Sequence, residues 1–247
     1  MDLWFGDSWP IGEELGQDTD VIDKTIFPNA VVGFGRDNPL KAFSTLVSNH
    51  RKQNFINFSK SGASIDFTVF NLINSYSEIP TPQYQPIKEK IQTEQQHTAF
   101  LCVTAQIRGF GIEYPVWSKL HYNTDKRKTV DRTEIYDSII AINCFYSICK
   151  NYNIDCVIIP IFCDLIIPEE FKHLVLFNSA ILSKTSLVEL TFGQKLIDDN
   201  LYNQGVSEIE IYDHLKNKDW IAPNRMHPNL LGHRKLAYKL IELLENR

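Results

Sequence analysis

Short apolar runs alternate along the chain with segments whose apolar positions recur at helical spacing. The runs are strand-sized and bounded by turn residues, so they predict buried strands over residues 3–5, 55–58, 98–104 and 156–163. The helical spacing predicts helices over residues 40–50, 64–76, 131–151 and 230–244. Strands that alternate with helices favour a mostly parallel sheet covered on both faces.

The remaining segments give weaker patterns. Prolines at 80, 82 and 86 predict a loop after the helix over 64–76, and Pro160 predicts a bulge or the end of its strand. Residues 164–222 suggest a strand near 174–177 and helices near 192–203 and 207–215. No repeat or linker divides the chain. We therefore predict one domain over residues 1–247, an α/β/α sandwich of three layers around a mostly parallel sheet.

Composition narrows the classes of function. The chain has 247 residues, of which 43% are hydrophobic and 22% charged, as in a globular domain with a sizeable core. The formal net charge is −5 and no basic stripe occurs, so we expect no nucleic-acid partner; we interpret the cluster Lys126-Arg127-Lys128 as a solvated loop. No apolar run approaches the roughly 20 residues of a membrane helix.

The cysteines and the first residues bear on the compartment. The five cysteines form no Cys-x-x-Cys pair and lie mostly in apolar surroundings, which predicts buried free thiols. No basic segment precedes the first apolar run, so we find no signal peptide and expect a cytoplasmic protein. A bacteriophage virion component is an alternative. We find no metal-ligand spacing among five of the histidines and expect no metal and no cofactor; the five are His50, His97, His121, His173 and His214.

Two residues at opposite ends of the chain could carry chemistry. Ser8 follows the first predicted strand, and ligands of parallel sheets bind at the carboxyl ends of the strands. His227 precedes the last predicted helix and could take a proton from a serine. The structural alternatives are a turn residue at Ser8 and a residue at the start of a helix at His227. Together, the two residues are typical of acyl transfer.

Three blocks carry a resemblance to a known family. They are Gly6-Asp7-Ser8-Trp9, Ser61-Gly62-Ala63-Ser64 and His227-Pro228-Asn229-x-x-Gly232-His233. In sequence and order they resemble the SGNH (GDSL-type) hydrolases over nearly the whole chain. The resemblance implies a flavodoxin-like fold, Ser8 as nucleophile, His227 as base, Asp7 as a brace of the turn, and backbone N–H groups of Ser8 and Gly62 in the oxyanion hole.

Two positions depart from the family pattern. Where its third block has an oxyanion-hole Asn, Gln106 is our candidate for the amide, with Thr104 and Arg108 as alternatives. The family places an Asp three residues before the base, and this chain has Asn224 there. Asn can accept a hydrogen bond from the imidazole but supplies no negative charge. A backbone carbonyl or another carboxylate could orient His227 instead; by position the candidates are Asp164 and Asp219.

Other residues complete the predicted site. Trp9 and Arg108 are candidate substrate contacts, and His233 is interpreted as a surface or packing residue. The resemblance implies hydrolysis of a small-molecule or glycan ester through an acyl-enzyme, with O-deacetylation of a carbohydrate as one candidate. Asn224 motivates the alternative of a binding or structural module with little catalysis. A transferase that passes the acyl group to an alcohol would use the same residues.

Overall fold

A four-stranded parallel sheet forms the centre of the described part of the chain. The computed structural model describes residues 1–12, 15, 23–29, 39–60, 63–103, 132–162, 164–193, 218–222 and 227–247. The strand order is β2-β1-β3-β4, and the bounds are Asp2–Phe5 for β1, Phe55–Asn57 for β2, Thr98–Val103 for β3 and Asp155–Pro160 for β4. This order is the one that flavodoxin-like sheets share.

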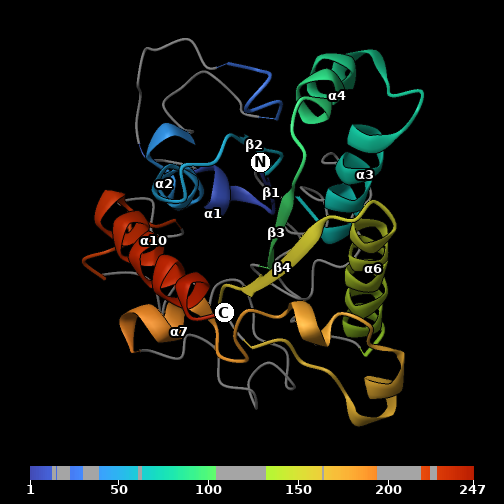
Figure 1. Cartoon of the computed structure of the whole chain (residues 1–247). Coiled ribbons are helices and arrows are strands. Elements are labelled where there is room, and N and C mark those ends of the chain that lie inside the picture. The colour runs from blue at the N-terminus through green and yellow to red at the C-terminus, as the bar shows by residue number, and fades with distance from the viewer. Residues whose placement is uncertain are drawn as a thin grey trace, which may run out of the picture.

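Helices cover both faces of the sheet (Figure 1). One layer holds α3 (Ile65–Tyr76), α4 (Gln85–Gln92) and α6 (Arg132–Asn151). The other holds α1 (Ser8–Ile11), α2 (Phe43–His50), α7 (Leu187–Phe192) and α10 (Leu230–Glu245). Short 3₁₀ helices lie at η1 (Pro39–Lys41), η2 (Pro82–Tyr84), η3 (Glu169–Leu174) and η4 (Asn178–Ala180). The predicted three-layer α/β/α architecture is confirmed.

The alternation of side chains along β1 explains why the strand is apolar throughout. Leu3 and Phe5 face the layer of α3 and α6, whereas Trp4 faces the layer of α2 and α10. Phe5 stacks on Phe58 at 4.9 Å between ring centroids, and Trp4 stacks on Phe100 at 4.2 Å. A strand buried on both faces needs apolar residues at every position, which is the pattern that the sequence shows.

The structure corrects two predictions about elements. The segment after the proline-rich stretch holds α4 as well as a loop, because Pro86 lies in the first turn of the helix, where its missing N–H costs nothing. The strand expected near residues 174–177 is wrong. Helix η3 ends there at Leu174. The chain pairs with the free edge of β4 only later, through an isolated parallel bridge between Ile158 and Ile181.

Helix α7 was not predicted, and it ends at Gly193 in the left-handed conformation. Apart from Phe192 and Gly193, the helices expected near 192–203 and 207–215 lie outside the described residues. The other predicted helices and strands are confirmed within a few residues, and Pro160 is the last residue of β4. No helix of the described ranges combines the length and apolarity needed to cross a membrane.

The cysteines differ in exposure. Cys102, Cys149 and Cys156 are buried free thiols, as expected, whereas Cys144 is exposed on α6. Cys163 lies outside the described residues. The prediction of buried thiols therefore holds for three of the four cysteines that are described.

Candidate active site

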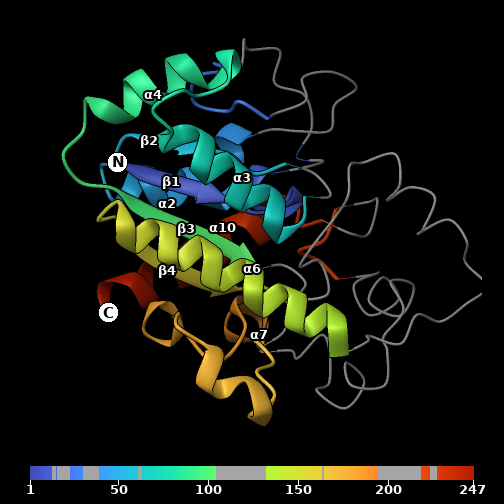
Figure 2. The same ribbon diagram turned by 90° about the vertical axis from the view of Figure 1, so that its right-hand side faces the viewer.

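The turn after β1 holds Ser8 at the carboxyl edge of the sheet, the edge toward which the arrowheads of β1 and β3 point in Figure 2. The Asp7 carboxylate accepts a hydrogen bond from the Trp9 N–H at 3.1 Å and caps α1, whose first residue is Ser8. A Cβ on Gly6 would lie 2.8 Å from Cγ of Pro10 and 3.0 Å from Cβ of Cys102. The turn therefore accepts only glycine at this position without a shift of its neighbours.

The loop after β2 lies against the same turn. The Lys60 N–H donates to the Gly6 carbonyl at 3.1 Å, and the Phe58 N–H donates to the Trp4 carbonyl at 2.7 Å. These bonds bring the start of the predicted second block beside the serine. Ser61 and Gly62 themselves lie outside the described residues.

The segment around His227 is fixed by a short antiparallel pairing. The Ala222 N–H donates to the His227 carbonyl at 2.8 Å, and the Asn229 N–H donates to the Trp220 carbonyl at 2.9 Å. A Cβ on Gly232 would lie 2.4 Å from the Trp220 carbonyl oxygen, so α10 can approach this pairing only through a glycine. The pairing sets where His227 stands relative to α10.

Asn229 joins the same pairing to the start of α10. Its Oδ1 accepts the Gly232 N–H at 3.0 Å and caps the helix. Its Nδ2 donates to the carbonyl oxygens of Asp219 and Ile221 at 2.7 and 3.2 Å. The Pro-Asn-x-x-Gly pattern after His227 thus has a structural explanation: it builds the helix start that carries the histidine.

The two segments meet at one hydrogen bond. His227 Nε2 lies 2.8 Å from Ser8 Oγ, and the two residues are 219 positions apart in the chain. Ser8 is only 6% exposed, and His227 is half-buried. A hydroxyl that donates to Nε2 requires a neutral ring with its proton on Nδ1. In this arrangement the imidazole can accept the serine proton as the oxygen attacks a carbonyl carbon.

Aromatic packing supports the meeting of the two segments. Trp9 packs edge-on against Phe162 at 4.4 Å and against Trp220 at 6.4 Å, and Trp220 stacks on Phe192 at 3.9 Å. Trp9 is 2% exposed. Its burial gives the ring a packing role between the serine and histidine segments, and a contact of Trp9 with substrate stays a prediction.

Several predicted site residues cannot be placed beside Ser8 and His227. Gly62, Gln106, Arg108 and Asn224 lie outside the described residues. The two carboxylates suggested by position have other partners. Asp164 accepts the Ser186 N–H at 2.8 Å, and the exposed Asp219 lies 3.9 Å from the Lys235 ammonium group.

His233, which we interpreted from the sequence as a surface or packing residue, is buried in the structure. It is fully buried, and its Nδ1 accepts the N–H of Phe43 at the start of α2, at 3.1 Å. Burial, with a smaller effect of nearby His227, lowers the pKa of His233 to about 3. No local pattern could have predicted this contact, because the two residues are 190 positions apart.

The described residues form a parallel α/β/α sandwich with a Gly-Asp-Ser turn after the first strand and a His-Pro segment before the last helix. No protein-family model matches the chain, and no curated protein matches it.

The solved structures that are similar to this chain include two that match it over its whole length. One is a carbohydrate esterase whose active site is described as having divergent catalytic and non-catalytic binding functions, with 16% identity and a TM-score of 0.47. This chain spans 64% of the length of that esterase. The other is a member of the lipolytic G-D-S-L family from Veillonella parvula DSM 2008, with 13% identity, 98% of that chain covered and a TM-score of 0.42.

Proposed function

We propose that the protein is a serine ester hydrolase in which Ser8 is the nucleophile and His227 the base. The observation that carries this proposal is the 2.8 Å contact between Ser8 Oγ and His227 Nε2. Ser8 Oγ would attack the ester carbonyl carbon while its proton moves to Nε2. Collapse of the tetrahedral intermediate would break the bond to the alcohol oxygen, which takes the proton from His227 and leaves an acyl-serine. Water, activated by the same imidazole, would release the acid.

The oxyanion would be held by N–H donors near Ser8. The Ser8 N–H belongs to the first turn of α1, where helix geometry provides no intrahelical acceptor. The sequence adds two proposed donors, the Gly62 N–H and the side-chain amide of Gln106. The Gln106 side chain is one methylene longer than the Asn of the family pattern. Donors of this kind stabilise the charge that develops on the carbonyl oxygen.

Asn224 bears on the expected rate. We propose that it orients His227 through its side-chain oxygen, without the negative charge that an Asp would provide for the imidazolium. The enzyme would then be slower than a hydrolase with a full triad. The proposed substrate is a small-molecule or glycan ester, with carbohydrate O-deacetylation as the first reaction to screen.

Labelling with a fluorophosphonate tests this function, because such probes phosphonylate an activated serine. We expect stoichiometric labelling of the wild type and none of Ser8→Ala, and a loss of at least about 100-fold in the labelling rate for His227→Ala. Ser75→Ala is the matched control, since Ser75 is a fully buried serine on α3 in the opposite layer. A folded wild-type protein that takes no label would contradict the proposal.

A second candidate is a binding module with the same fold and little or no catalysis, and Asn224 in the sequence is the observation that favours it. In that case a glycan or partner would bind saturably without ester cleavage, and Ser8→Ala would leave binding intact. Titration calorimetry with acetylated oligosaccharides, on wild type and Ser8→Ala, separates the two candidates. A transferase would instead show product formation that depends on an added alcohol.

A further inference from the structure

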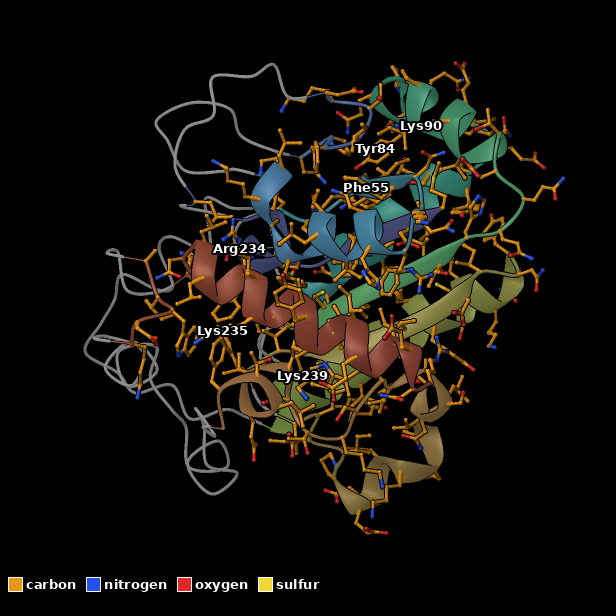
Figure 3. All side chains as sticks on the ribbon, turned by 60° about the vertical axis from the view of Figure 1, so that its left-hand side comes forward. Phe55, Tyr84, Lys90, Arg234, Lys235 and Lys239 are labelled. Carbon is orange, nitrogen blue, oxygen red and sulfur yellow. The ribbon has the colours of Figure 1, made fainter. Side chains whose placement is uncertain are left out.

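The first turn of α2 contacts the two segments that carry the proposed catalytic pair, at residues that follow Ser8 and His227. The Ser44 hydroxyl donates to the carbonyl of Pro10, two residues after Ser8, at 2.5 Å. The adjacent Phe43 N–H donates to Nδ1 of His233, six residues after His227, at 3.1 Å. Phe43, Ser44 and His233 are each 0% exposed. Figures 1 and 3 show α10 lying beside α2, with Arg234, Lys235 and Lys239 labelled along α10 in Figure 3.

His233 supplies what α2 lacks at its start. The N-cap of α2 is Ala42, which has no side chain that can accept a hydrogen bond. The Phe43 N–H would otherwise be a buried donor without an acceptor, and such a group destabilises the folded state. The imidazole accepts this bond and lies nearly parallel to the Phe43 ring, with centroids 5.8 Å apart. α10 is therefore tied to α2 at the turn nearest His227.

The acceptor role requires a neutral ring with its proton on Nε2. Burial keeps the pKa of His233 near 3, so the ring stays neutral at physiological pH. Within the described residues Nε2 has no hydrogen-bond partner. A carbon in place of Nε2 should therefore be tolerated, whereas loss of Nδ1 should not.

The Pro10 carbonyl accepts two hydrogen bonds from buried side chains. Besides Ser44 it accepts the Asn57 amide of β2 at 2.9 Å, and that amide also lies 3.0 Å from Ser44 Oγ. Asn57 Oδ1 in turn accepts the Ser59 N–H at 3.0 Å. The end of α1 is thus fixed to α2 and to the loop that leads toward Gly62.

We propose that Ser44 and His233 are positioning residues that hold the Ser8 and His227 segments in reacting geometry through the first turn of α2. This inference rests on the proposed function. A displacement of about 1 Å between reacting groups can lower a rate by about 100-fold, so the contact should affect the rate more than substrate affinity.

Four variants test the proposal. Ser44→Ala removes the donor to Pro10. His233→Phe keeps a flat ring over Phe43 but removes the acceptor. His233→Asn places an oxygen where Nδ1 stood but loses the ring. Ser75→Ala is the control, because it deletes a buried hydroxyl that donates to a carbonyl at 2.7 Å within α3.

The readout is the fluorophosphonate reaction at a temperature well below unfolding, resolved into probe affinity and maximal rate constant. We expect the maximal rate constant to fall about 10- to 100-fold in Ser44→Ala and His233→Phe, with affinity unchanged. We expect His233→Asn to stay within about threefold of the wild type and Ser75→Ala to match it. By denaturation both His233 variants should be destabilised, His233→Phe because it leaves the Phe43 N–H without an acceptor and His233→Asn because its smaller side chain leaves a cavity.

The comparison of rate with stability separates positioning from packing. If His233 served only the core, the rate constant of each variant would fall with its stability, and His233→Asn would lose rate as well. The double variant Ser44→Ala/His233→Phe should lose less than the product of the two single losses, because both act through one turn.

The proposal is overturned if Ser44→Ala and His233→Phe are labelled as fast as Ser75→Ala. If the wild type itself takes no label, the proposed function fails, and the geometry is read from the ¹⁵N resonance of His227 Nε2. In that case the signal in Ser44→Ala and His233→Phe should move toward its position in Ser8→Ala. A signal that stays at the wild-type position in both would overturn the positioning role independently.

Discussion

Gly6 and Gly232 lie on the two segments that the Ser8–His227 hydrogen bond joins, and each allows a close approach of the backbone to a neighbour. Gly6 lies against Pro10 and Cys102, and Gly232 lies against the Trp220 carbonyl. At both positions the neighbouring atoms occupy the space that a side chain would need. Small changes there should therefore disturb the site more than their size suggests.

Gly232→Ala tests this at one residue. The new methyl would lie 2.4 Å from a backbone oxygen, so the Trp220 pairing must shift, at a cost of roughly 1–3 kcal/mol and with slower labelling of Ser8. Gly193→Ala is the control, since nothing lies within 4 Å of its Cβ position and it carries only the strain of its left-handed backbone. Equal labelling rates in both variants would contradict the expectation.

The cysteines provide a second prediction for single residues. Burial, with a smaller contribution from the Asp7 charge, raises the pKa of the Cys102 thiol. The pKa of the Cys149 thiol is raised by its hydrogen bond with Cys156 and by burial. Because the thiolate is the reactive form, both should resist iodoacetamide in the native protein, whereas exposed Cys144 should react. Peptide mass mapping before and after denaturation checks this. Native modification of Cys102 would show that the turn around Gly6 opens.

At the scale of the element, α10 depends on Asn229 for more than a cap. An ordinary N-cap residue contributes about 1 kcal/mol, but Asn229 also donates to two carbonyls of the paired segment. Asn229→Ala should therefore destabilise the protein more than Ser186→Ala, which removes only the cap of α7. Urea denaturation measures the difference, and equal midpoints would contradict it. Asn229→Asp should keep the cap but place a carboxylate oxygen against the carbonyl oxygens of Asp219 and Ile221, so it should stay less stable than the wild type.

The elements also show how much the sequence determines. The strands were predictable because each is a short apolar run buried on both faces, and the helices α3, α6 and α10 because each buries a face whose periodicity is local. Helix α4 was not, because Pro86 was interpreted as a loop signal although proline suits a first turn. The positions of Ser8 and His227 followed from motifs, whereas the contacts of Ser44 and His233 did not, since those depend on how separate helices pack.

At the scale of the whole molecule, each helical layer contains a histidine held neutral. In one layer His97 Nδ1 lies 2.8 Å from the Tyr76 hydroxyl, and its Nε2 lies 3.2 Å from the Ile91 carbonyl. In the other layer His233 accepts the Phe43 N–H. Burial is the main cause that lowers the pKa of each below 6.5. The unfolded chain therefore binds more protons than the folded one below that pH.

The consequence is a loss of stability in mild acid. The contribution of these histidines is complete above pH 6.5 and falls as the pH decreases toward the folded-state pKa. For His233, with a folded pKa of about 3, the loss at pH 5 is about 2 kcal/mol. Urea midpoints at pH 7.5 and 5.0 measure it. His97→Asn and His233→Asn should each reduce the pH dependence, and an unchanged dependence in both would contradict this origin.

The separation of 219 residues between Ser8 and His227 has a further consequence for biosynthesis. Protein chains emerge from the ribosome amino end first, so the sheet can assemble around Ser8 while the segment with His227 is still unmade. A partly synthesised chain would carry the proposed nucleophile without its base. The proposed catalytic pair would then be complete only after the segment with His227 has been synthesised, and chains arrested before that segment would lack the proposed base.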